Sequence, residues 1–354
     1  MGRFPRERLA RWPGSTPTLP SACVVRQIHF LSDSDFAMTM SSLRSFRRCT
    51  VIAWRGFVLL LAGLVALHAN RAVAQDAFDC RNTGAESAPV TTIETTLAGV
   101  PALLRVPKSI TRAPIVLWHG FGPPASERAL MDALPLDDVR AIKVYLGLPL
   151  FGKRLEGGTT DALVRRQSTD VASLMFEPVV VGAAHELPAV LDALRAKGCM
   201  KRGDEIGLFG FSGGGAAVLI ALAERKVAVR SAVVLNASTG LSASIAAYEK
   251  ATGTSYVWTD AARKLARATD AIGRTGEIAK GHPPVALLIV QGTADATLMP
   301  QRAIDLDKAL EKKYAPRDRA RLQLTLADGL SHNVTDAASL ADVRRWTADW
   351  FTRW

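Results

Sequence analysis

Short apolar runs alternate with helical segments along most of the chain, and this alternation restricts its fold more than any other feature. Such runs are typical of strands that are buried on both faces of a sheet. The predicted strands lie at 115–118, 142–146, 206–209, 232–235, 285–290 and 322–326. The predicted helices lie at 126–134, 171–197, 216–225, 302–313 and 337–350. Strands that alternate with helices predict an α/β fold, with a mostly parallel central sheet and helices on both faces.

Two departures from this alternation complete the expected architecture. Residues 91–97 and 101–106, joined by the turn Ala98-Gly99, predict a β-hairpin at the start of the domain. Residues 237–282 show helical runs at 242–252 and 260–272 but no clear strand, which predicts a short helical cap insertion. A long surface excursion is the alternative, although loops of that length without a function are uncommon. We expect residues 75–354 to form one catalytic domain.

The long helix at 171–197 contains two prolines, Pro178 and Pro188, and either of them is a candidate for a break. Gly198 follows the helix directly and is well placed to end it, because glycine readily adopts the left-handed conformation of a helix C-terminus.

Residues 1–74 differ in composition from the remainder of the chain, because they hold ten arginines, no lysine and only three acidic residues. Arginines lead into the apolar run Gly56–Leu67, and the small residues Ala72-Val73-Ala74 follow it. These features are typical of the basic, apolar and cleavage regions of a secretory signal peptide. The run is short for a membrane span, which needs about 20 apolar residues. The alternative to a cleaved signal peptide is an uncleaved N-terminal anchor.

We predict that the signal peptide covers residues 38–74 and begins at Met38 or Met40. Residues 1–37 would then be an extension that is not part of the natural protein. The chain is accordingly expected to be exported, to the periplasm or outside the cell.

The net charge of +11 comes mainly from this N-terminal segment, whose ten arginines and three acids account for +7 and leave +4 for residues 75–354. The remaining charges are spread without a basic run, which favours a solvated surface over a nucleic-acid partner. Two cysteines remain after the segment, and we predict that Cys80 and Cys199 form a disulfide in an oxidising compartment. Two separate buried thiols are the alternative. The sequence shows no metal-ligand spacing, so no metal is expected.

The sequence Gly210-Phe211-Ser212-Gly213-Gly214 stands between a predicted strand and a predicted helix. A serine on a sharp strand-to-helix turn has a strained backbone, and the turn closes only if the residues two positions away on either side lack bulk. The helix N-terminus that follows favours negative charge at a carbonyl under attack. Ser212 is therefore the candidate nucleophile.

A serine nucleophile needs a histidine base and an acid further along the chain. Asp295 follows the predicted strand 285–290, and His332 follows the strand 322–326. Asp295 could instead merely cap a turn, and the rival acids are Asp305, Asp328 and Asp336. Asn236, at the end of the preceding strand, cannot be the anion. We predict Asp295 as the acid and His332 as the base.

The loop His119-Gly120-Phe121-Gly122 follows the first parallel strand, and its glycines let the backbone approach a substrate. We expect the N–H groups of Phe121 and Gly213 to form an oxyanion hole, and Phe121, Phe211 and Gly122 to lie at an apolar substrate pocket. His119 is interpreted as a structural histidine that is bonded to a neighbouring loop, rather than as a proton-transfer group.

The order of these motifs resembles that of the α/β-hydrolase superfamily. The resemblance rests on the motifs His119-Gly120, Gly210–Gly214, Gly292-Thr293-Ala294-Asp295 with Pro300, and His332. Over residues 90–354 the chain is most similar to esterases and to the catalytic domains of prolyl-oligopeptidase and dienelactone-hydrolase relatives. It departs from dienelactone hydrolases at Ser212, where they carry cysteine.

The resemblance implies the α/β-hydrolase fold and a serine hydrolase that cleaves carboxylic esters through an acyl-enzyme. A peptidase or amidase of the prolyl-oligopeptidase type would use the same triad, and a non-catalytic binding protein could share the fold. The expected partner is a small ester or a short peptide. We expect no cofactor, no nucleic-acid partner and no membrane span after signal cleavage, and the sequence leaves the oligomeric state open.

Overall fold

The computed structural model of the chain describes residues 78–80 and 89–354. The predicted extension at 1–37 and the predicted signal peptide at 38–74 lie outside the described residues.

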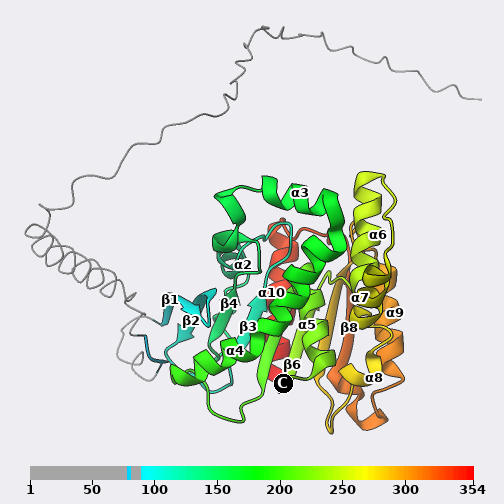
Figure 1. Cartoon of the computed structure of the whole chain (residues 1–354). Helices are drawn as coiled ribbons and strands as arrows, with labels where there is room; N and C mark the ends of the chain where they lie inside the picture. Colours follow the sequence, from blue (N-terminus) through cyan, green and yellow to red (C-terminus); the bar gives the residue numbers. More distant parts are fainter. Residues whose placement is uncertain (1–77, 81–88) are drawn as a thin grey trace, which may run out of the picture. The chain divides into compact units, whose positions relative to one another are not determined.

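A single eight-stranded sheet forms the centre of the domain, in the order β1-β2-β4-β3-β5-β6-β7-β8 (Figure 1). The strands are β1 (Val90–Leu97), β2 (Val100–Pro107), β3 (Ile115–Trp118), β4 (Lys143–Leu146), β5 (Ile206–Phe211), β6 (Val229–Leu235), β7 (Ala286–Gly292) and β8 (Leu322–Ala327). The β1–β2 and β2–β4 pairs are antiparallel, and all other neighbours are parallel. The mostly parallel sheet and the initial hairpin are thus confirmed.

Helices cover both faces of this sheet, because alternate side chains of a buried strand point to opposite sides. Along β3, Ile115 and Leu117 pack with one face, whereas Val116 and Trp118 pack with the other. The first face holds α2 (Glu127–Ala133) and α10 (Ala337–Arg353), and the second holds α4 (Gly182–Ala196), α5 (Gly213–Glu224) and α9 (Pro300–Glu311). Figure 1 shows α4 and α5 in front of the sheet and α10 behind it.

The long predicted helix differs from the expectation in its first half. It begins at Val171 as a π-helix (Val171–Val181) and continues directly as α4, so neither Pro178 nor Pro188 breaks it. Asp170 defines the start, because its extended backbone ends the preceding helix α3 (Asp161–Asp170) and its carboxylate accepts hydrogen bonds from Ala172 N and Ser173 N. The sequence gives no indication of α3, because this helix has no fully buried residue and therefore carries little apolar periodicity.

Three helices occupy the segment between β6 and β7, where the cap insertion was predicted. They are α6 (Leu241–Thr252), α7 (Asp260–Thr269) and α8 (Thr275–Ile278). Short 3₁₀ turns lie elsewhere, at Gly152–Arg154, Glu156–Gly158 and Pro316–Arg321. The hydroxyl of Tyr256, between α6 and α7, donates a hydrogen bond of 2.8 Å to Asp170 and so ties this segment to the start of the π-helix.

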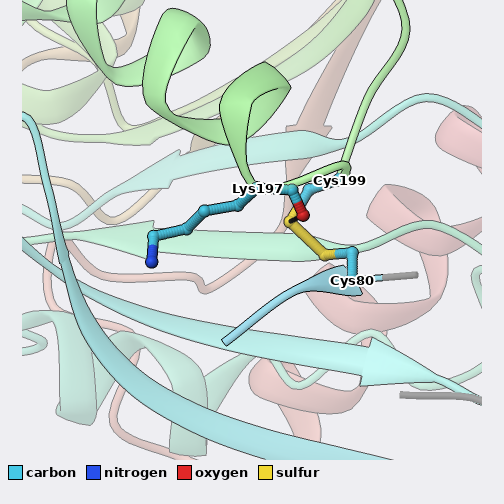
Figure 2. Close-up of a disulfide and its surroundings, with 3 residues drawn as sticks. All are labelled: Cys80, Lys197 and Cys199. Carbon is cyan, nitrogen blue, oxygen red and sulfur yellow. Dashed lines mark hydrogen bonds between the residues drawn. A yellow bond between two sulfur atoms is a disulfide. The ribbon is translucent and has the colours of Figure 1, made fainter. Parts of the chain in front are cut away.

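Cys80 and Cys199 form a disulfide that joins the segment before the first strand to the end of α4 (Figure 2). The backbone N–H of Cys80 also donates to the carbonyl of Lys197, at 2.9 Å. A cross-link between residues 119 positions apart restricts the unfolded chain strongly. On the chain-entropy model it stabilises the fold by about 4 to 5 kcal/mol.

Within the described residues, one helical stretch, 161–196, is long and apolar enough to cross a membrane. Half of its most apolar window is buried inside the molecule, where its side chains join the core against the sheet. Core helices pass the same length and composition test.

Candidate active site

Ser212 stands at the junction of β5 and α5, with its backbone in a conformation that L-residues rarely adopt. Its φ is 54° and its ψ is −115°, and the helix begins at the next residue. The strain is held by bonds on both sides, since Ser212 N donates to Leu235 O and Ser238 N donates to Ser212 O. This is the sharp strand-to-helix turn that the sequence predicts, and it presents the serine at the carboxyl end of β5.

Two glycines are sterically required for this turn to close. A Cβ at Gly210 would lie 2.2 Å from the carbonyl oxygen of Gly214, and a Cβ at Gly214 would lie 2.4 Å from the carbonyl oxygen of His119. Backbone atoms cannot yield to such contacts, so any side chain at either position would force the turn apart.

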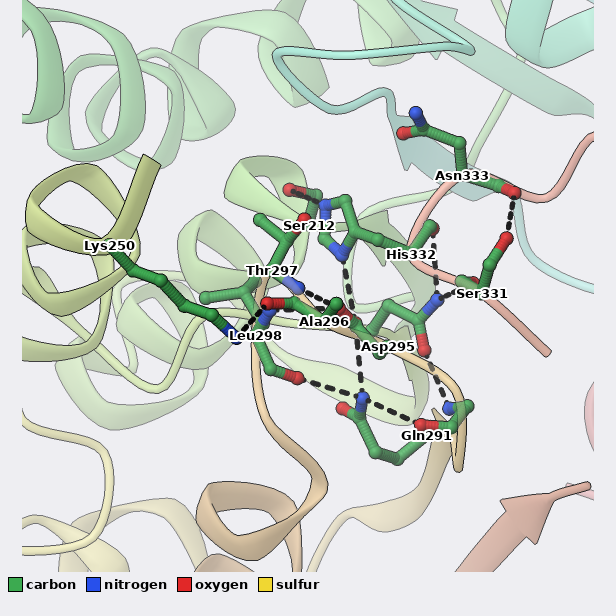
Figure 3. A network of polar contacts seen from close by, with 12 residues as sticks. Ser212, Lys250, Gln291, Asp295, Ala296, Thr297, Leu298, Ser331, His332 and Asn333 are labelled. Atoms are coloured by element: carbon green, nitrogen blue, oxygen red, sulfur yellow. Dashed lines mark hydrogen bonds and ion pairs between the residues drawn. The ribbon is translucent and has the colours of Figure 1, made fainter. Parts of the chain in front are cut away.

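The structure brings Ser212, His332 and Asp295 into one hydrogen-bonded line (Figure 3). His332 Nε2 lies 3.0 Å from Ser212 Oγ, and His332 Nδ1 lies 2.8 Å from Asp295 Oδ2. The Asp295 side chain is fully buried and that of His332 is 12% exposed, so the hydrogen bond between them is shielded from water while the imidazole edge can reach a substrate. The contacts are those of a nucleophile, its base and an orienting acid.

The carboxylate of Asp295 is held by the loop that follows β7. Its Oδ1 accepts hydrogen bonds from Thr297 N and Leu298 N, both at 2.8 Å. Its Oδ2 accepts one from Gln291 Nε2 at 3.1 Å, in addition to the contact with His332. The rival acids Asp328 and Asp336 bond elsewhere, to Thr293 and to the start of α10.

Asn236, which occupies the other strand end where an acid could stand, instead organises the loop of His332. Its amide nitrogen donates to Ser331 O at 2.9 Å and to His332 O at 3.0 Å. Its amide oxygen accepts from Gly292 N at 2.8 Å. The residue therefore joins the ends of β6 and β7 to the loop that carries the base, a role that no sequence motif indicates.

His119 is fully buried and connects two loops at the site. Its Nδ1 lies 2.7 Å from Gly120 O, and its Nε2 accepts a hydrogen bond of 3.2 Å from Leu148 N. Because Leu148 supplies an N–H, Nε2 must be the unprotonated nitrogen and Nδ1–H donates to Gly120. Burial lowers the pKa of His119 to about 4, partly offset by the bond to Gly120. The neutral ring is thus a structural link, as its position in the sequence indicates.

We expect the free energy of unfolding to fall as the pH drops from about 6.5 to about 4, because the unfolded chain then binds a proton at His119 that the buried ring excludes. The pKa of His119 is about 4 in the native state, below the value of about 6.5 in the unfolded chain. The free energy of unfolding is therefore about 3 kcal/mol higher above pH 6.5 than below pH 4. Urea unfolding at several pH values measures it. The His119→Gln variant should lose less stability over this range.

The matched control for this measurement is His282→Gln, because His282 is exposed in the loop before β7. That variant should keep the parental pH dependence. Equal slopes for the His119→Gln variant and the parent would contradict the assignment of His119 as a neutral link.

The backbone donors predicted for an oxyanion hole lie on either side of Ser212. The N–H of Phe121 has no acceptor among the described residues. Gly213 is the first residue of α5, so its N–H has no intrahelical acceptor. A Cβ at Gly213 would lie 2.8 Å from the Phe121 ring, which shows how closely the two segments approach. Both N–H groups are free to bind an oxyanion.

Aromatic rings surround the nucleophile, but not all as expected. The Phe121 ring stacks on Phe151 with a centroid distance of 5.2 Å and packs over Gly213. Phe211, predicted to line the substrate pocket, is fully buried and lies beneath the His332 ring, at a centroid distance of 5.4 Å. It supports the base rather than lining an open surface, because its side chain points to the face of the sheet covered by α2 and α10. Phe151 was missed, since a single phenylalanine in a loop gives no periodic signal.

Gly122 lies opposite the loop of His332. A Cβ at this position would stand 3.1 Å from the side-chain oxygen of Asn333, so the two loops approach across the site. Beside the acid loop, an apolar cavity of about 390 Å³ lies between α6 and the start of α9. Its walls include Ala237, Ala243, Ala246, Ala247, Leu298 and Met299. Within the described part of the chain, no group of three metal-ligating side chains is present.

Residues 182–354 match the model of the prolyl oligopeptidase family. The matched residues include Ser212, Asp295 and His332, and so cover the whole hydrogen-bonded line. No curated protein sequence matches the chain.

Solved structures share the fold at low sequence identity. The chain is similar to TT1662 from Thermus thermophilus, with 21% identity, a TM-score of 0.57 and coverage of 75% of this chain and 99% of that one. It is also similar to a puromycin-hydrolyzing peptidase of Mycobacterium tuberculosis, with 16% identity, a TM-score of 0.53 and coverage of 75% and 39%. A third similar structure is the acylaminoacyl peptidase of Pyrococcus horikoshii, with 14% identity and a TM-score of 0.53. The match covers 75% of this chain and 42% of that one. The chain thus spans about two fifths of each peptidase.

The fold, the family match and the line from serine through histidine to aspartate agree in the chemistry that they indicate. The chain has the α/β-hydrolase fold, and its residues 182–354 are similar to the prolyl oligopeptidase family.

Proposed function

We propose that the protein is an exported esterase, which cleaves carboxylic esters with Ser212 as nucleophile, His332 as general base and Asp295 as the acid that orients the base. The observation that carries the proposal is the continuous contact from Ser212 Oγ through both ring nitrogens of His332 to a buried carboxylate. This arrangement activates a serine hydroxyl for attack on a carbonyl carbon.

In the first step, His332 Nε2 takes the proton of Ser212 Oγ as that oxygen attacks the ester carbonyl. Negative charge develops on the carbonyl oxygen, where the N–H groups of Phe121 and Gly213 and the N-terminus of α5 stabilise it. His332 returns the proton to the departing alcohol, and an acyl-enzyme remains. A water molecule, deprotonated by the same nitrogen, then releases the acid.

The apolar cavity beside the acid loop supports an ester with an apolar acyl or alcohol group. Six of the eleven residues that line it are alanine, leucine or methionine, and burial of hydrocarbon against them is favourable. The other five residues of the lining are Ser242, Lys250, Thr297, Gln301 and Arg302. We propose this cavity as the place where such a group is held.

The second candidate is a serine peptidase or amidase, and the match to the prolyl oligopeptidase family favours it. Two of the structures that share the fold belong to peptidases. Such an enzyme must also protonate an amine leaving group, which the same histidine can do.

Export is supported by the apolar run and small-residue site at 56–74 and by the disulfide between Cys80 and Cys199, since disulfides persist in oxidising compartments. The substrate would then be a small ester outside the cytoplasm.

A matched pair of chromogenic substrates tests the proposal. We expect the purified protein to release p-nitrophenol from p-nitrophenyl butyrate and to leave butyryl and prolyl p-nitroanilides uncleaved, because an esterase has no subsite that grips a peptide backbone. Turnover of the prolyl anilide at a rate comparable with the ester would support the peptidase candidate. A folded protein that neither cleaves the ester nor reacts with a fluorophosphonate probe would contradict both.

A further inference from the structure

Gln291 lies at the carboxyl end of β7, four residues before Asp295, and is only 1% exposed. Its amide nitrogen lies 3.1 Å from Asp295 Oδ2, 3.1 Å from Leu298 O and 3.4 Å from Gly292 O (Figure 3). All three neighbours are acceptors, which identifies this side of the amide as the NH₂ group. Its two protons are thus donated to the carboxylate and to the loop that follows it.

The contact to Asp295 has a specific place in the triad. Oδ1 of the carboxylate is held by two backbone N–H groups, whereas Oδ2 faces only His332 Nδ1 and Gln291. Among the described residues, Gln291 and His332 are therefore the two side chains that contact Asp295 Oδ2. This is the oxygen that orients the imidazole. Asp295 is the titratable side chain that Gln291 contacts, and His332 lies directly beyond it.

The loop of residues 295–298 does not depend on Gln291 alone. Asp295 N donates to Gly292 O at 3.3 Å, and Lys250 Nζ, from α6, donates to Ala296 O at 2.7 Å. Loss of the glutamine donors would leave these anchors in place while releasing Oδ2. The effect of a substitution should consequently fall on the acid of the triad more than on the position of the loop.

We propose that Gln291 is a positioning residue for the catalytic acid. It holds Asp295 Oδ2 against His332 Nδ1 and, through Leu298 O, closes the acid loop onto β7. The inference rests on the proposed triad chemistry, but not on whether the natural substrate is an ester or a peptide.

Two substitutions test this role in the full-length protein. Gln291→Met keeps the length of the side chain and removes both donors, and we expect kcat for p-nitrophenyl butyrate to fall about 10- to 100-fold, the effect of losing one hydrogen bond to a charged group. The KM should stay within about threefold, because the change affects the transition state rather than ground-state binding.

Gln291→Glu places a carboxyl group against a carboxylate and two carbonyl oxygens. At pH about 8 two like charges face each other, so the loss should exceed that of the methionine variant. As the pH falls to about 5 the two carboxyls share a proton and one donor is restored. The ratio of variant to parental kcat/KM should therefore rise on acidification, which a merely structural defect would not produce.

The matched control is Gln323→Met, since the amide of Gln323 also donates a hydrogen bond, to Thr325 Oγ1 at 3.2 Å, but is exposed near the start of β8. It should keep the parental kcat. Parental kcat in the Gln291→Met variant, or a Gln291→Glu deficit that is constant across pH, would overturn the inference. Failure of the parent itself to react with a fluorophosphonate would instead contradict the proposed function, so the two failures are distinguishable.

Discussion

The Ser212→Ala variant is expected to hydrolyse p-nitrophenyl esters about 10⁴ to 10⁶ times more slowly than the parent, because it lacks the atom that forms the acyl-enzyme. The fold should survive, since the backbone bonds of Ser212 to Leu235 and Ser238 do not involve its side chain. Initial rates at saturating substrate, together with circular dichroism, measure both quantities. Covalent labelling by a fluorophosphonate should disappear in the same variant.

Ser168→Ala is the control for this experiment, because Ser168 is an exposed serine of α3 whose hydroxyl bonds only to Arg165 O. It should retain parental turnover and labelling. Parental turnover in the Ser212→Ala variant would end the proposal that Ser212 is the nucleophile.

The Asp295→Asn variant is expected to lose about 10⁴ in kcat, because its hydrogen bonds would stabilise the wrong tautomer of the base. Two backbone N–H groups, from Thr297 and Leu298, point at the Oδ1 position and require an acceptor there. The amide oxygen must occupy that position, which turns the NH₂ group toward His332 Nδ1. The imidazole would then carry its proton on Nε2, where it faces Ser212 Oγ and cannot accept the serine proton.

Asp328→Asn is the matched control, since Asp328 is an exposed acid in the loop that leads to the base and bonds only to Thr293. Steady-state kinetics and the rate of fluorophosphonate labelling should separate the two variants clearly. If the Asp295→Asn variant kept kcat within about tenfold of the parent, Asp295 would not be the orienting acid.

The parallel strands and the turn at Ser212 could be predicted from sequence because each depends on neighbours in the chain. A run such as Ile115–Trp118 is too short and too apolar for an exposed helix, and the structure has a strand over the same residues. Glycines two positions before and after Ser212 are a local requirement of a closed turn, as the contacts of Gly210 with Gly214 demonstrate. The helix α3, in contrast, has no buried face and gave no periodic signal.

The substrate side of the site was less accessible to sequence reasoning. The position of Phe211 beside Ser212 predicts a residue of the substrate pocket. Its side chain instead points to the face of the sheet that α2 and α10 cover, and the sequence around Ser212 does not specify this direction. Gln291 and Asn236 carry no motif, and their amide groups acquire a role only when β6, β7 and the loop of His332 lie together.

By itself, the sequence determined the class of fold, the order of the strands along the chain, and three chemically suited side chains at strand ends, because periodicity and turn chemistry act over a few residues. Only the tertiary structure decided that Ser212 Oγ and Asp295 Oδ2 approach opposite nitrogens of one imidazole, although 83 residues separate them in the chain. Pairing of the parallel strands brings their carboxyl ends to a single edge of the sheet, and that long-range register sets distances of 3.0 Å and 2.8 Å, which no local pattern encodes.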